Sequence, residues 1–207
     1  MIRILVADDQ ALIRQAFAAL LGLEGDLEVI AQAADSAEVL RLVAVERPDV
    51  ILMDIQMPGP DGDGDDGITA TAEVVARHPD TKVIILTTFG RPGYLRRAME
   101  AGAVGFMIKD APAEQLIEGI RRVMRGLRVV DPALAADSLT RGASPLTARE
   151  TEVLAAAAGG GTTARIAATV HLSEGTVRNH LSAAMGKLGA GNRSEAIRIA
   201  TESGWLD

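Results

Sequence analysis

The sequence predicts a doubly wound α/β domain with a five-stranded parallel sheet, followed by a linker and a small all-α domain of four helices. The length supports two domains, because 207 residues exceed the roughly 100 to 150 that one domain usually contains. In the first 125 residues, short apolar runs alternate with segments of helical periodicity, as strands and helices of one parallel sheet do. After residue 145 only helical patterns remain.

Five apolar runs supply the expected strands, at residues 2–7, 27–31, 50–53, 82–86 and 104–108. Three of these runs are almost continuous in Val, Ile and Leu rather than alternating, which is typical of parallel strands buried on both faces. Segments with helical spacing separate the runs, for example at Leu12, Ala16 and Ala19. A last helix from Pro112 to about Arg125 closes the domain, since proline suits a first helical turn.

The connection after the third strand is too long for a simple helical crossover. The interval between strand starts is 32 residues there, against 22 to 25 elsewhere. The excess coincides with residues 58–67, whose Pro, Gly and Asp content predicts an enlarged loop. Asp61, Asp63 and Asp65 have the alternate spacing of a calcium-binding loop, but Asp66 and Ala72 stand where that motif has Gly and Glu. A flexible acidic loop is the plainer interpretation.

The pattern lapses between residues 126 and 144, so we expect domains at 1–125 and 145–207 with a linker between them. Residues 147–150, Thr-Ala-Arg-Glu, form a capping box that opens the first of four short helices. Breaks at 159–161, 171–173 and 189–192 separate the others.

The composition excludes several classes of protein. Without cysteine there are no disulfides, thiolate nucleophiles or cysteine zinc sites. No apolar run approaches the roughly 20 residues of a membrane span, and acidic residues begin at Asp8, so we expect a cytoplasmic protein with no membrane partner. The net charge of −7 argues at first against DNA, but residues 1–125 hold 13 basic and 20 acidic side chains, whereas the remainder holds eight of each. The acidity therefore belongs to the α/β domain alone.

Polar side chains follow the ends of four predicted strands. Asp8 and Asp9 end the first strand and Asp54 ends the third, which is its neighbour in the simplest doubly wound order. Three crowded carboxylates are tolerable around a hard cation, and oxygen ligands suit Mg²⁺. Thr87 and Lys109 follow the fourth and fifth strands at the same edge. A metal, a hydroxyl and an ammonium around one carboxylate form an arrangement for holding a phosphoryl group on it.

These residues, with Met-Pro-Gly at 57–59, resemble the receiver domain of two-component response regulators over residues 1–125. The resemblance implies that a sensor histidine kinase phosphorylates Asp54, that Thr87 follows the phosphate as a switch, and that Lys109 pairs with the phosphate. It also implies Mg²⁺ bound by Asp8, Asp9, Asp54 and the backbone carbonyl of Gln56. Phe106 occupies the aromatic switch position of the family, with a place in the core as the alternative. A phosphatase of the haloacid dehalogenase type would need a general acid where Gln56 stands, so we expect no enzyme acting on an external substrate.

Residues 162–170, the turn at 171–172 and the N-cap Ser173 predict a helix-turn-helix, although the periodicity also allows a small interaction bundle. Polar side chains face away from the apolar side of the second helix and could reach phosphates or base edges. The stretches at 146–150, 166–167, 172–181, 187–189 and 192–196 resemble the LuxR-type DNA-binding domain of NarL/FixJ response regulators. A group of actinobacterial, DesR-like regulators has a similar recognition helix and a similar Gly-Trp-Leu ending at 204–206.

The second resemblance implies a recognition helix from about residue 174 to 187 in the major groove of DNA. Its base-reading positions are Arg178, Asn179 and Ser182, and its phosphate-contacting positions are Thr176, Lys187 and Arg193. The final helix, at about 194–203, resembles a dimerisation surface, with core packing of Ile197 and Trp205 as the alternative. We therefore expect a DNA-binding transcription regulator that forms a homodimer and binds promoter half-sites when Asp54 is phosphorylated. The alternatives are a phosphorylation-independent, metal-responsive transcription factor and a scaffold that does not bind DNA.

Overall fold

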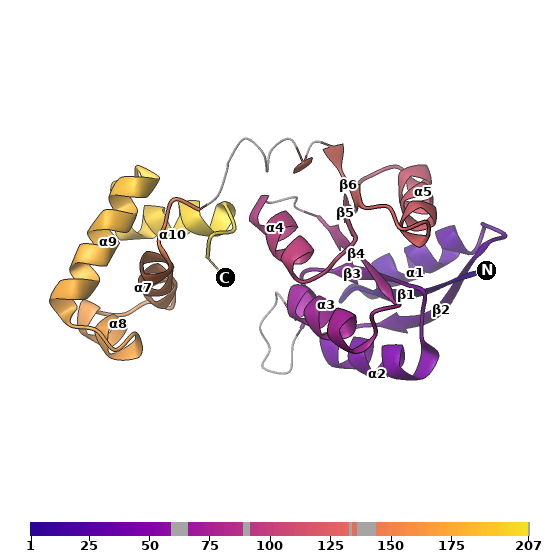
Figure 1. Cartoon of the computed structure of the whole chain (residues 1–207), viewed down its shortest axis with the longest axis horizontal. Coiled ribbons are helices and arrows are strands. Elements are labelled where there is room, and N and C mark those ends of the chain that lie inside the picture. Colours follow the sequence, from indigo (N-terminus) through magenta and orange to yellow (C-terminus); the bar gives the residue numbers. More distant parts are fainter. Residues whose placement is uncertain (59–65, 89–91, 133, 136–143, 207) are drawn as a thin grey trace. The chain divides into compact units, whose positions relative to one another are not determined.

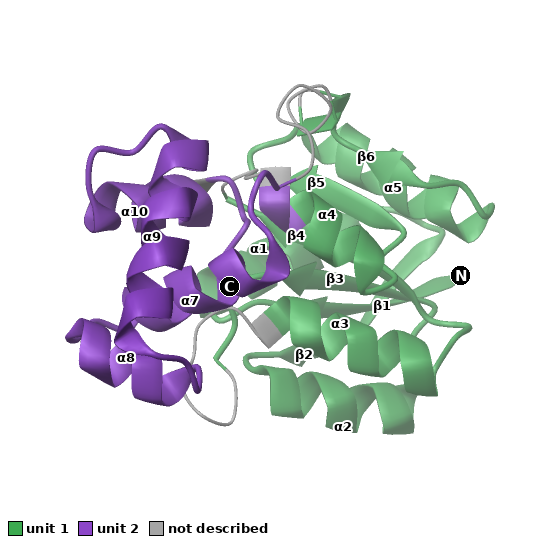
Figure 2. Cartoon of the chain, turned by 60° about the vertical axis from the view of Figure 1, so that its left-hand side comes forward, with its two compact units in different colours: residues 1–90, 95–135 green, residues 91–94, 136–207 purple. Residues whose placement is uncertain are grey.

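The computed structural model describes residues 1–58, 66–88, 92–132, 134–135 and 144–206. The chain divides into two compact units, residues 1–90 with 95–135 and residues 91–94 with 136–207 (Figure 2). Each unit has its own hydrophobic core.

The first unit is a parallel sheet with helices on both faces (Figure 1). Its strands are β1 (Ile2–Ala7), β2 (Leu27–Ala33), β3 (Val50–Asp54), β4 (Lys82–Thr87), β5 (Gly105–Ile108) and β6 (Val129–Val130), in the order β2-β1-β3-β4-β5-β6. The helices are α1 (Ala11–Leu21), α2 (Ser36–Glu46), α3 (Asp66–Arg77), α4 (Pro92–Glu100) and α5 (Ala113–Met124). This architecture confirms the predicted doubly wound α/β class.

The expectation of five strands is wrong, because the described sheet has six. Strand β6 lies in the segment 126–144 that we expected to be linker, and its two residues pair with Gly105 and Phe106 of β5. A strand of two residues is too short to show periodicity in the sequence, so only its pairing with β5 distinguishes it from loop.

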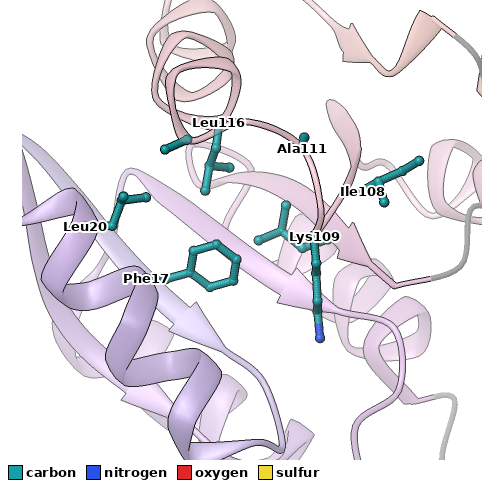
Figure 3. Close-up of a pocket in the computed structure, with 8 residues that line it drawn as sticks. Phe17, Leu20, Ile108, Lys109, Ala111 and Leu116 are labelled. Atoms are coloured by element: carbon teal, nitrogen blue, oxygen red, sulfur yellow. The ribbon is translucent and has the colours of Figure 1, made fainter.

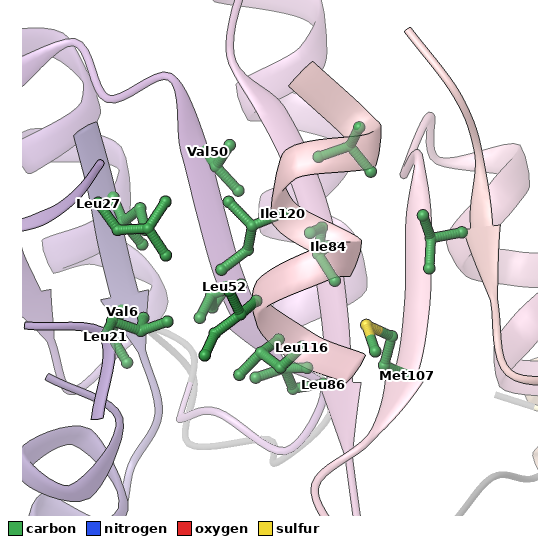
Figure 4. Packing of buried hydrophobic residues seen from close by; sticks show 14 residues of the cluster. Val6, Leu21, Leu27, Val50, Leu52, Ile84, Leu86, Met107, Leu116 and Ile120 are labelled. Atoms are coloured by element: carbon green, nitrogen blue, oxygen red, sulfur yellow. The ribbon is translucent and has the colours of Figure 1, made fainter. Parts of the chain in front are cut away.

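The core of the first unit explains why the strand sequences are nearly continuous in apolar residues. All five positions of β3 are buried, since the strand is central and helices cover both its faces. On one face, Ile120 and Leu116 of α5 pack over Leu52 of β3 and Ile84 of β4 (Figure 4). The carboxyl ends of β1, β3, β4 and β5 are thereby held at one edge of a rigid sheet.

The predicted acidic loop and its candidate calcium ligands Asp61, Asp63 and Asp65 lie outside the described residues. Both flanks are described. Pro58 precedes the segment, and its carbonyl accepts hydrogen bonds from the backbone N–H and the hydroxyl of Ser36, at 3.3 and 3.4 Å. Helix α3 follows it.

The second unit has four helices among its described residues, as the sequence predicts: α7 (Ala148–Ala158), α8 (Thr163–Thr169), α9 (Glu174–Leu188) and α10 (Arg193–Glu202). The capping box is present, with Thr147 and Glu150 bonded reciprocally. The hydroxyl of Ser173 caps α9, and Gly189 ends it in the left-handed conformation. Ile197 and Trp205 are partly buried against the core of this unit.

None of the described helices is both long enough and apolar enough to span a membrane.

Candidate phosphoacceptor pocket and nucleic-acid interface

The sheet brings the predicted acidic residues to one edge. Strands β1 and β3 are paired so that Ala7 lies beside Met53, and the residues that follow, Asp8 and Asp54, lie next to each other. On the other side of β3, Thr87 ends β4 beside Ile108, the last residue of β5. The residues that follow or end β1, β3 and β4 therefore lie at one edge of the sheet and form a single pocket.

Three carboxylates converge in this pocket. Asp8, Asp9 and Asp54 each offer an oxygen, and these oxygens lie within 4.8 Å of one another. Asp8 and Asp54 are buried, at 2% and 4% exposure, whereas Asp9 is exposed. The backbone N–H of Gln10 donates to Asp8 Oδ1 at 2.9 Å, which fixes that carboxylate. Carboxylate oxygens at this spacing, with one side open to water, fit a hard divalent cation such as Mg²⁺.

Lys109 joins the two buried carboxylates. Its Nζ lies 2.7 Å from Asp8 Oδ2 and 2.8 Å from Asp54 Oδ2. Burial raises the pKa of the Asp54 carboxyl above its usual value, although the hydrogen bond and charge of Lys109 partly offset this effect. Burial alone would lower the pKa of the Lys109 ammonium, but its hydrogen bonds to Asp54 and Asp8 outweigh burial and raise it. The pocket thus holds the positively charged Lys109 ammonium between Asp8 and Asp54. One positive charge does not balance the negative charges of the carboxylates around it.

The stem of Lys109 runs along an apolar wall (Figure 3). A cavity of about 100 Å³ lies there, lined by Phe17 and Leu20 of α1 and by Leu116 of α5. This wall leaves the ammonium directed toward the carboxylates. The backbone N–H of Lys109 also donates to the carbonyl of Thr87 at 2.8 Å, so the loops after β4 and β5 are held together.

The remaining predicted pocket residues lie as follows. Thr87 is buried at the end of β4, at 4% exposure. Gln56 is exposed just beyond β3. Phe106 is fully buried on β5, so in this structure its ring belongs to the core, the alternative stated above.

In the second unit, the predicted base-reading residues Arg178, Asn179 and Ser182 are exposed on α9. The side chain of Arg178 is 66% exposed and lies 3.9 Å from Glu174, a surface pair too open to hold it firmly. The hydroxyl of Thr176 lies 2.8 Å from that of Ser173 at the start of the helix. Helix α9 therefore presents exposed or partly exposed polar side chains along one stretch, from Thr176 to Ser182.

Lys187 and Arg193, the other two predicted phosphate-contacting residues, also have partners within the unit. Lys187 Nζ lies 2.6 Å from Glu150 Oε2, and Arg193 Nη1 donates to the carbonyl of Gly161 at 3.0 Å. Glu150 is 6% exposed, and the hydrogen bond from Lys187, followed by that from the Thr147 backbone, lowers the pKa of its carboxyl. Sequence reasoning found Glu150 only as a capping residue, because 37 positions separate it from Lys187 and no local pattern joins them.

Comparison with known families agrees with both halves of this architecture. The response regulator receiver domain matches residues 4–121, and the luxR family of bacterial regulatory proteins matches residues 144–200. The chain belongs to the response regulators that join a receiver domain to a LuxR-type DNA-binding domain. These proteins are transcriptional regulators rather than enzymes, and receiver domains generally bind Mg²⁺ at an acidic pocket.

The similarity to individual proteins extends over the full chain. The chain is 44% identical to the uncharacterized transcriptional regulatory protein YvfU of Bacillus subtilis (strain 168). It is 43% identical to the transcriptional regulatory protein DesR of the same organism, and in each case the match covers 100% of both chains. The response regulator ChrA of a heme-sensing two-component system is 33% identical and covers 97% of this chain and 96% of its own, with a TM-score of 0.58. The RcsB response regulator of Salmonella typhimurium, at 22% identity, covers 97% of this chain and 100% of its own with a TM-score of 0.72 and shares the fold.

Proposed function

We propose that a sensor histidine kinase phosphorylates Asp54, and that the phosphorylated chain dimerises and binds paired DNA half-sites. The observation that carries this proposal is the convergence of Asp8, Asp54 and Lys109, with both carboxylates within 2.8 Å of the Lys109 ammonium. A pocket with this charge arrangement suits the formation and stabilisation of an acyl phosphate. The cytoplasm, where DNA and the kinase's catalytic domain would both be accessible, is the proposed location.

In the proposed reaction, a carboxylate oxygen of Asp54 attacks the phosphorus of a phosphohistidine. The phosphorus–nitrogen bond breaks as the new phosphorus–oxygen bond forms, and the leaving imidazole takes up a proton. Lys109 would then exchange its contact with the Asp54 carboxylate for one with a phosphoryl oxygen, and the Thr87 hydroxyl would bond to another. Asp8, Asp9, Asp54 and the Gln56 carbonyl would hold Mg²⁺, whose charge would neutralise the phosphoryl oxygens.

The proposed DNA interface is the exposed face of α9, together with Arg193 at the start of α10. Arg178, Asn179 and Ser182 would read base edges, since a helix in the major groove presents such side chains to them. Thr176, Lys187 and Arg193 would lie closer to the phosphates, and Lys187 would do so while it pairs with Glu150. An RcsB–DNA complex, at 23% identity, has the same fold over 97% of this chain with a TM-score of 0.71.

The experiment that tests the pocket is phosphorylation by acetyl phosphate with Mg²⁺, followed by intact mass. The wild-type chain should gain one phosphoryl group, and Asp54→Ala should gain none. Asp80→Ala, which removes an exposed carboxylate from the same unit, is the matched control and should label like wild type. Equal labelling of Asp54→Ala would refute the assignment.

A phosphorylation-independent transcription factor is the second candidate, because residues 60–67, which follow Asp54 closely in the sequence, are rich in acidic side chains. The two functions differ in oligomeric state. Phosphorylation control requires that beryllofluoride with Mg²⁺ converts monomer to dimer, whereas the second candidate requires the same oligomer with and without this phosphate mimic.

A further inference from the structure

The start of α3 lies against the backbone of the proposed phosphoacceptor. A Cβ atom built on Gly67 would lie 1.9 Å from the carbonyl oxygen of Asp54, 3.0 Å from its carbonyl carbon and 3.1 Å from the Cα of Ile55. All three neighbours are backbone atoms, so no side-chain rotation could relieve the overlap. Only glycine fits this position.

Two hydrogen bonds fix Gly67 in this contact. Its N–H donates to the carbonyl of Ile55 at 3.1 Å, and its carbonyl accepts from the buried hydroxyl of Thr71 at 2.7 Å. Asp54 itself ends the central strand β3, where it pairs with Leu86 of β4. The sheet side of the contact is therefore rigid, and a larger residue at 67 would have to displace either the first turn of α3 or Asp54.

From this geometry we infer that Gly67 is a positioning residue for Asp54. Because Gly67 has no side chain, the first turn of α3 can contact the backbone of Asp54 directly. This contact keeps the Asp54 carboxylate in position beside Lys109 and Asp8. The described residues on either side of 59–65 are both hydrogen-bonded: Ser36 donates to the carbonyl of Pro58, and the N–H of Gly67 donates to the carbonyl of Ile55. The inference rests on the proposed function, since it gives Gly67 a role in phosphorylation of Asp54.

The sequence alone does not single out this residue. Four glycines occur between positions 59 and 67, and nothing in the composition of this segment distinguishes one of them from the others. Of these, Gly67 is the one within the described residues, and its contact with Asp54 distinguishes it from an ordinary loop glycine.

The test compares Gly67→Ala with Gly25→Ala in the full chain. A Cβ at Gly25 meets nothing within 4 Å, so this control makes the same chemical change in the same unit without a clash. Both variants are incubated with acetyl phosphate and Mg²⁺ well below their melting temperatures, and the rate of phosphoprotein formation is measured by intact mass. We expect Gly67→Ala to react at least tenfold more slowly than wild type and Gly25→Ala to react within twofold of it. A residue needed only for folding would lower the melting temperature without changing the rate in the folded state.

A rate for Gly67→Ala within twofold of wild type would overturn the inference. If Gly67→Ala does not fold, the phosphorylation rate of Thr71→Val tests the inference instead. This variant keeps the shape of the side chain and removes the hydroxyl that donates to the Gly67 carbonyl. We expect that variant to react several-fold more slowly, and an unchanged rate would overturn the inference. Failure of the proposed function is distinct, since it would appear as no Asp54-dependent labelling of the wild-type chain.

Discussion

Replacement of Lys187 by Met should destabilise the second unit, because it leaves the buried Glu150 carboxylate without its ammonium partner. Lys187 Nζ and Glu150 Oε2 are 2.6 Å apart, and Glu150 is 6% exposed. A hydrogen bond to a charged group contributes roughly 1.5–3 kcal/mol, and removing one partner of a fully buried pair costs roughly 3–5 kcal/mol. The Lys187 side chain is 38% exposed and Thr147 still donates to Glu150, so the expected loss is at the lower end, about 1.5 kcal/mol.

The single tryptophan of the chain makes this loss measurable in the intact protein. Trp205 packs against the core of the second unit, so its fluorescence during urea denaturation reports unfolding of that unit. The matched control is Arg149→Met, which breaks an exposed pair with Glu152 and should cost less than about 0.5 kcal/mol. If the two variants lose unfolding free energies within about 0.3 kcal/mol of each other, which is the scatter expected for independent sites, the Lys187–Glu150 pair does not stabilise the unit as proposed.

The pH dependence gives an independent check of the same pair. The pKa of Glu150 is lower in the folded chain than its usual 4.5, so its stabilisation is complete above that pH and is lost as the pH falls through the lowered pKa. Wild type and Lys187→Met should therefore differ at pH 7 and converge in acid. A constant difference down to pH 2 would show that the loss comes from packing of the lysine stem.

Three further predictions concern the two proposed sites. Mg²⁺ at about 100 times its dissociation constant should stabilise the first unit by about 2.7 kcal/mol in thermal unfolding, and Asp9→Asn should remove most of that shift; an equal shift in the variant would exclude Asp9 as a ligand. Lys109→Met should raise the pKa of the buried Asp54 further, so labelling by acetyl phosphate, which needs the carboxylate, should be lost at a higher pH than in wild type; coincident pH profiles would contradict the assigned role of Lys109. Arg178→Ala should weaken binding to a selected DNA duplex by about 1–3 kcal/mol in a gel-shift assay while labelling of Asp54 is unchanged, and unchanged affinity would remove Arg178 from the interface.

The sequence predicts well those elements whose burial is evident from a continuous run of apolar residues. Strand β3 is buried at every position and is apolar up to Asp54, so the sequence reveals both the strand and the polar residue that ends it. The convergence of Asp8, Asp54 and Lys109 follows from the rule that parallel strands end at one edge. Strand β6 is missed because two residues show no period and their pairing with β5 is tertiary.

Contacts between distant residues account for what the sequence does not show at the sites. From the sequence, Lys187 is predicted to contact phosphates from an exposed helix face, and Glu150 is predicted only as a capping residue. In the structure, α7 packs against α9 and brings the two side chains together. The close approach of Gly67 to Asp54 is likewise a property of the folded backbone. In both cases the residue type is visible in the sequence but the neighbour that gives it a role is not.

Control of DNA binding by phosphorylation of Asp54 can be tested by measuring the affinity for DNA before and after phosphorylation. A duplex is first selected from a random library with the beryllofluoride-treated chain, and its affinity is then measured for wild type and Asp54→Asn, each with and without acetyl phosphate and Mg²⁺. Two linked half-sites bound by a dimer should raise the affinity of phosphorylated wild type by about 10²-fold or more, with no change for Asp54→Asn. Equal affinity of wild type with and without acetyl phosphate, at verified phosphorylation of Asp54, would show that phosphorylation does not control DNA binding.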